Sequence, residues 1–90
     1  MNPTFPGAGE PYRLYTHCGI SEARHRESYY ELVPPLHDGN VNPPAGWGNP
    51  YQLGTLTPVS PTQVVFTDDA GHRVTFTLRL GATTWKQLCD

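Results

Sequence analysis

Ten prolines and nine glycines in 90 residues constrain the fold of this chain more than any other feature. A proline inside a helix removes a backbone hydrogen-bond donor, and a glycine weakens any regular element. Long helices are therefore excluded, and we expect short strands joined by turns and loops. A chain of this length makes one domain, close to the smallest size at which a single hydrophobic core is adequate.

Alternation of apolar and polar residues predicts five strands. They cover residues 11–20, 27–33, 51–60, 62–67 and 74–80. The segment SEARHR (21–26) is predicted to join the first two strands as a polar turn or a single helical turn. The segment DDAG (68–71) is predicted to join the last two as a hairpin, in which Gly71 is free to adopt a positive φ.

These strands predict an all-β fold, either a small antiparallel five-stranded barrel or a two-layer sandwich, with a long Pro/Gly loop. Pro58 confines the strand at 51–60 to a sheet edge or a bulge, and the expected partner of that strand is 62–67. The segment TTWK (83–86) is compatible with one short helical turn. Residues 1–10 are predicted to be a flexible tail and residues 11–90 the single β domain.

The two cysteines, Cys18 and Cys89, are predicted to form a disulfide. In the chain-entropy model, closing so long a loop stabilises a fold by roughly 4 kcal/mol. Two buried thiols are the alternative, since free cysteine packs as a small hydrophobe. No metal site is expected, because the cysteines and the scattered histidines lack the local pairs typical of zinc ligands. A reactive pair is not expected either, because His17 and Cys18 are strand neighbours that point to opposite faces.

The segment PPLHDGNVNPPAGWGNPY (34–51) is a connection of a length that is usually functional or disordered. Trp47 argues against disorder, since its indole can fold onto the core as a lid or lie on the surface as a stacking platform. The stretch 38–42 begins like a calcium loop. However, Pro43 and Asn49 stand where an EF-hand requires glycine and glutamate. A weak calcium site outside the EF-hand class stays open as an alternative, but Asx turns explain the same residues without a ligand, and no cofactor is expected.

Charge and hydropathy argue against two classes of partner. The formal net charge is −2 and the six basic residues are spread out, so nucleic acid is not an expected partner. No apolar run approaches the roughly 20 residues that cross a bilayer, so direct membrane insertion of this chain is not expected. A cytoplasmic location is expected if Met1 is the natural start, because the first residues lack a secretory signal pattern. An extracytoplasmic location is expected if the chain is a trimmed ectodomain in which the disulfide forms.

A combination of short motifs resembles a family of short proteins of high-GC Gram-positive bacteria. The motifs are YTHCGI, PPLHDG, NPPAGWGNPYQLGT, FTDDAGH and a near-terminal LCD. The similarity covers about residues 11 to 90, and the tryptophan loop is its most specific part. It implies a domain that stands nearly alone or follows a membrane anchor. It implies no activity and supplies no catalytic residues.

The predicted function is that of a non-enzymatic binding or accessory module. Aromatic residues make up 11% of the chain, more than so small a core can easily hide. The predicted contact surface consists of Trp47, Tyr51, Tyr29, His37 and His17, and the expected partner is a protein, a peptide or a saccharide. Two alternatives stay open, a purely structural domain and a small hydrolase or metal-dependent enzyme centred on His17, Cys18 and His37.

Overall fold

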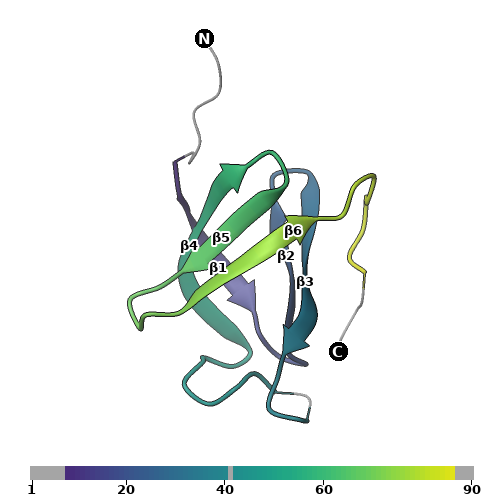
Figure 1. Cartoon of the computed structure of the whole chain (residues 1–90). Coiled ribbons are helices and arrows are strands. Elements are labelled where there is room, and N and C mark those ends of the chain that lie inside the picture. The colour runs from purple at the N-terminus through teal and green to yellow at the C-terminus, as the bar shows by residue number, and fades with distance from the viewer. Residues whose placement is uncertain (1–7, 41, 87–90) are drawn as a thin grey trace.

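The computed structural model describes residues 8–40 and 42–86, and this part of the chain forms one antiparallel β-sheet without a helix. The strands are β1 (Glu10–Tyr15), β2 (Ile20–His25), β3 (Ser28–Leu36), β4 (Tyr51–Ser60), β5 (Gln63–Thr67) and β6 (Arg73–Leu78). Their order across the sheet is β1-β4-β5-β6-β3-β2 (Figure 1). The predicted all-β class is confirmed, with six strands in place of five.

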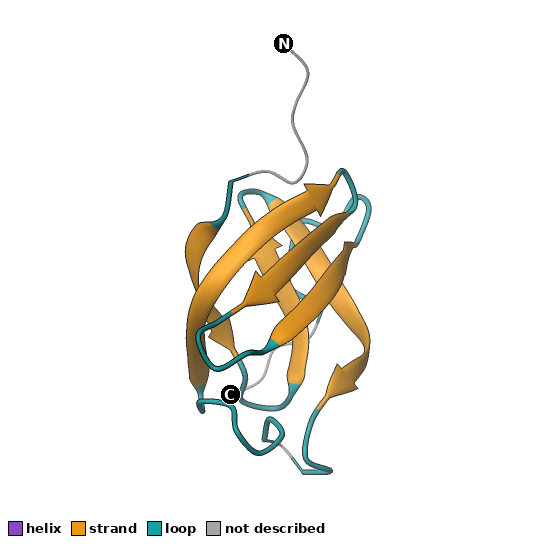
Figure 2. Ribbon diagram, turned by 60° about the vertical axis from the view of Figure 1, so that its left-hand side comes forward, coloured by secondary structure: helices purple, strands orange, loops and turns teal. Residues whose placement is uncertain are grey.

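The sheet curls on itself, as Figure 2 shows, so that its two outermost strands come to face each other. Three hairpins, β2–β3, β4–β5 and β5–β6, contribute the local pairings. Two long-range pairings, β1–β4 and β3–β6, join these hairpins into one sheet. The result is a half-barrel whose two edges are β1 and β2, the first two strands of the chain.

The hydrophobic core fills the concave side of this sheet. In β6, for example, Val74 and Phe76 are buried, while Arg73, Thr75 and Thr77 between them are exposed, as the alternation predicts. The buried cluster comprises Leu14, Ile20, Ala23, Tyr30, Leu56, Val64, Phe66, Val74 and Phe76. Every strand contributes at least one member, so the core holds the curl of the whole sheet.

Gly54 of β4 is where the core comes closest to the backbone. A Cβ atom at this position would lie 2.5 Å from Cζ of the Phe66 ring and would also collide with the carbonyl oxygen of Thr67. Because Gly54 has no side chain, the Phe66 ring can pack directly against the backbone of β4, and Phe66 is fully buried. Packing, and not a special φ angle, requires glycine here.

The predicted turn at 21–26 is wrong, because residues 20–25 form β2. The chain reverses earlier, at Cys18 (φ 71°) and Gly19 (φ 97°), so the first strand ends at Tyr15 and not at Ile20. The sequence of β2 is too polar to be typical of a strand, because it includes a buried carboxylate, on Glu22. The hydrogen-bond partners of this carboxylate lie more than fifty positions away in the sequence. A local pattern cannot show such a partner.

The hairpin with Gly71 at positive φ (92°) and the pairing of β4 with β5 are confirmed. Pro58 lies at a register shift, beyond the last residue of β4 that β1 reaches, which agrees with the predicted bulge. Residues 83–86 form no helical turn. Most of the predicted N-terminal tail lies outside the described residues, and β1 begins within it at Glu10.

Candidate binding site at an open seam

The two edge strands, β1 and β2, are joined by residues 16–19 alone, yet they do not pair with each other. Within the described residues, β1 pairs with β4 only and β2 pairs with β3 only. Consecutive strands with so short a connection commonly form a hairpin. Here they diverge from the turn and leave a gap between two strand edges, which we call the β1–β2 seam. The edge of a sheet presents backbone donors and acceptors to which a further extended segment can pair.

Side chains bridge the seam at the end that lies away from the turn. The Tyr12 hydroxyl, from β1, accepts a hydrogen bond of 2.9 Å from the backbone amide of Arg24, in β2. Burial raises the pKa of Tyr12, and the hydrogen bond from Arg24 offsets part of that rise. The Glu10 carboxylate lies 3.7 Å from Nδ1 of His25 and 3.9 Å from a guanidinium nitrogen of Arg26. These contacts hold the strands together without a backbone ladder.

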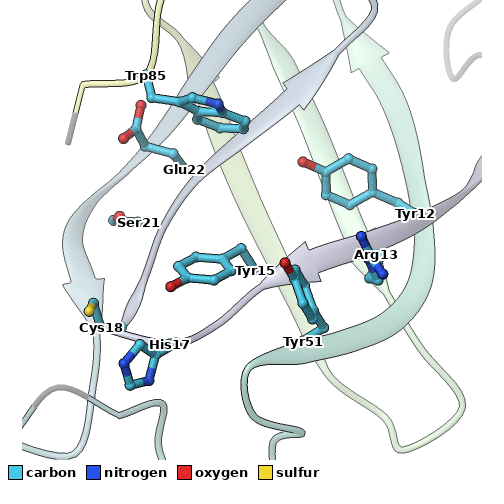
Figure 3. A pocket seen from close by; sticks show the side chains of 10 residues that line it. Tyr12, Arg13, Tyr15, His17, Cys18, Ser21, Glu22, Tyr51 and Trp85 are labelled. Carbon is cyan, nitrogen blue, oxygen red and sulfur yellow. The ribbon is translucent and has the colours of Figure 1, made fainter. Parts of the chain in front are cut away.

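Toward the turn, the seam opens into a pocket of about 320 Å³, which we call the seam pocket (Figure 3). Figure 3 shows Tyr15 and Tyr51 on one side of it, and Glu22 and Trp85 on the other. His17 and Cys18 line its end at the turn. A cavity of this size lies at the lower limit of ligand sites in proteins, and a mixed aromatic and polar lining is typical of them.

The β1–β4 wall of the seam pocket is built from cross-strand neighbours on the outer face of the sheet. Tyr15 lies directly opposite Tyr51 in the register, and their rings meet edge to face with centroids 5.4 Å apart. His17 adds a second edge-to-face contact to Tyr15, at 6.3 Å. The Arg13 guanidinium lies 4.2 Å above the centre of the Tyr51 ring. Contacts of this kind fix the orientation of each ring in the absence of a ligand.

The opposite wall is the segment that follows β6. Its anchor is Glu22, whose side chain is 6% exposed and accepts hydrogen bonds from Nη1 of Arg79 (3.1 Å) and from the amide of Lys86 (2.7 Å). Trp85, beside this anchor, packs edge to face on Tyr29 at 5.1 Å. Because the anchor is a paired, buried carboxylate, the segment is fastened to β2 and holds Trp85 at the pocket.

The structure separates the five predicted contact residues. His17 and Tyr51 line the seam pocket. Tyr29 is buried beneath Trp85, and His37 lies in the connection between β3 and β4. Trp47 packs against the core. The pocket is also lined by three residues outside the predicted contact surface, Arg13, Tyr15 and Trp85. The alternation of β1 was a signal for Arg13 and Tyr15, because it places both on the same face as His17.

Trp47 is half-buried and forms part of a cluster at the β5–β6 turn. Its indole stacks on the His72 ring at 3.8 Å and on Phe66 at 6.0 Å. Nδ1 of His72 lies 2.6 Å from Oδ2 of Asp68, whose side chain is 1% exposed. Burial alone raises the pKa of Asp68, but the hydrogen bonds from His72 and Ala70 lower it more, so the net pKa lies below its usual value. Trp47 thus closes the core as a lid.

The remaining candidate ligands have structural partners. The Asp38 carboxylate accepts the amide of Asn40 at 2.7 Å, an Asx turn, and the Asn49 amide group donates to the side-chain oxygen of Asn42 at 3.0 Å. Across the described ranges no three His, Cys, Asp or Glu side chains are placed to hold a metal ion. Cys89, the predicted disulfide partner of Cys18, lies outside the described residues.

Comparison of the chain with models of known protein families, with curated protein sequences and with solved structures returns no match. The resemblance to the Gram-positive family therefore stays a prediction. In the part of the chain that the structure describes, no helix is long and apolar enough to cross a membrane.

Proposed function

We propose that the protein is a non-enzymatic binding module and that the seam pocket is its ligand site. One observation carries this proposal: within the described residues, two consecutive strands do not pair with each other, and an aromatic pocket lies between them. A fold that served only its own stability would gain hydrogen bonds by pairing β1 with β2. The pocket also contains two residues of the predicted contact surface, His17 and Tyr51.

A peptide segment fits this site better than a saccharide. Sugars stack on an open aromatic face, but the Tyr51 ring carries the Arg13 guanidinium above it and meets Tyr15 at its side. A peptide uses backbone hydrogen bonds to strand edges and places side chains into neighbouring pockets. Tyr51 and Trp85 are 40% and 38% exposed, and both can contact such a side chain. The ligand proposed here is therefore an extended peptide segment of a partner protein.

The proposed disulfide between Cys18 and Cys89 agrees with this site. Trp85 and Cys18 line the same pocket, and the amide of Lys86 is bound to Glu22 in β2. Cys89 follows Lys86 by three residues, each of which spans at most about 3.5 Å. A bridge to Cys18 would tie the segment that carries Trp85 to the β1–β2 turn. We propose that the bridge keeps this wall of the pocket in place.

Selection of a random dodecapeptide library displayed on phage tests the proposed function. We expect the enriched peptides to bind the full chain and to lose at least about tenfold in affinity for Tyr51→Ala, which removes a partly exposed aromatic contact. Leu80→Ala is the matched control, because Leu80 is 92% exposed and lies outside the seam pocket.

Thermal unfolding of both variants shows whether they remain folded. Binding that survives Tyr51→Ala would contradict the proposed site, and so would a selection without enriched peptides. Peptides sensitive to Trp47→Phe but not to Tyr51→Ala would move the contact surface to the tryptophan loop.

A further inference from the structure

Among the described residues, Arg13 is the one basic group on the β1–β4 wall of the seam pocket. It projects from the outer face of β1 and is exposed to solvent. Its guanidinium is held 4.2 Å above the Tyr51 ring. The N–H donors of a guanidinium lie in its own plane, and those that the ring does not cover can bind a further group. The contact with Tyr51 holds the cation at the pocket before any ligand arrives.

No carboxylate of the described residues lies within ion-pair distance of Arg13. The ion pairs go elsewhere: Arg26 lies against Glu10, Arg79 against Glu22 and Lys86 against Glu31. Glu22 lines the same pocket from the opposite wall, but its carboxylate is occupied by Arg79 and by the Lys86 amide. Among the described residues, the pocket therefore presents a cation without an ion-pair partner and a negative charge that is already compensated.

We propose that the peptide bound in the seam pocket carries a carboxylate that pairs with Arg13, next to an aromatic side chain that enters the pocket. This inference rests on the proposed function and specifies its ligand. Arginine binds a carboxylate through two parallel N–H···O bonds, and such charge-assisted bonds are about twice as strong as neutral ones. The aromatic neighbour meets the ring of Tyr15, on the wall that carries Arg13, and the ring of Trp85, on the opposite wall.

Two sources could supply the carboxylate, an acidic side chain or the carboxyl terminus of the partner. The structure offers the same contact to both, because only the guanidinium and the aromatic rings are involved. An acidic side chain inside an extended segment leaves backbone groups on both sides to meet the edges of β1 and β2. We therefore assign an internal aspartate or glutamate, and the experiment below separates the two sources.

The test uses short blocked peptides and NMR titration of the full, isotope-labelled chain. An N-acetylated, C-amidated aspartyl-phenylalanine is expected to shift amide signals of β1, β2 and the Trp85 indole. The asparaginyl analogue is expected to bind at least about tenfold more weakly, the range for loss of a charged hydrogen bond. Arg13→Gln should abolish the difference between the two peptides, and Arg73→Gln, which removes an exposed arginine from β6, should preserve it.

The other outcomes of this titration distinguish the source of the carboxylate, the role of Arg13 and the proposed function from one another. If the asparaginyl peptide with a free carboxyl terminus binds as tightly as the blocked aspartyl peptide, the carboxylate requirement stands and its source is the chain end. If both blocked peptides bind equally at the seam, the role of Arg13 is overturned and the proposed function survives. If none of the peptides shifts any seam signal, the seam pocket is not a peptide site and both proposals fail.

Discussion

Reduction of the proposed bridge between Cys18 and Cys89 is expected to lower the free energy of unfolding by about 4 kcal/mol. The bridge would close a loop that spans most of the chain, and opening it returns conformational entropy to the unfolded state. For a domain of this size, that loss approaches the whole stability of a marginal fold. Urea denaturation with and without dithiothreitol measures the difference directly.

Cys18→Ser provides the matched control for this prediction. The variant should have the stability of the reduced protein and should not respond to the reductant. Titration of the untreated protein with a thiol reagent gives an independent reading, and we expect no reactive thiol. Two titratable thiols in protein purified without reductant would rule the bridge out, and the chain would then rely on its core alone.

Gly54→Ala is expected to destabilise the fold by about 3 kcal/mol, the upper range for overpacking a core. The added methyl group would meet the Phe66 ring and the Thr67 carbonyl, and the latter is backbone within β5 and cannot move aside. For a domain of this length, such a loss lowers the melting temperature by roughly 15 °C. Calorimetry or thermal circular dichroism would record the change.

Gly39→Ala serves as the comparison. Gly39 has a positive φ of 94° and no atom within 4 Å of an added Cβ, so only backbone strain of about 1 kcal/mol is expected. The two alanine variants separate steric overlap from conformational preference. If Gly54→Ala costs no more than Gly39→Ala, the close approach between β4 and the Phe66 ring has been assigned too much weight.

The β5–β6 hairpin and the core of β6 could be predicted because their signals are local. Both signals involve residues that are adjacent in the sequence, namely the alternation from Val74 to Phe76 and the turn that ends in Gly71. β2 could not be predicted, because a glutamate such as Glu22 is typical of an exposed position. Its partners, Arg79 and Lys86, are distant in the sequence and come close only in the folded chain. A buried charge with distant partners has no local signature.

The same reasoning explains which part of the site was foreseen. His17 and Tyr51 were expected at a contact surface, and both line the pocket. Trp85 was not, because its place depends on the anchoring of the last described segment to β2. The seam itself depends on the curl of six strands, which no single strand pattern specifies. Trp47 was predicted at the contact surface because two glycines flank it in a long loop. Its ring instead stacks on His72.

The central claim is that β1 and β2 face each other across an open seam, and nuclear Overhauser contacts test it most directly. We expect Hα–Hα contacts for β1 with β4 and for β2 with β3, and none between β1 and β2. Across the seam, we expect a contact from the Tyr12 ring to the Arg24 amide. A continuous series of Hα–Hα contacts between β1 and β2 would show a paired hairpin in solution, and the seam pocket with its proposed ligand would then be ruled out.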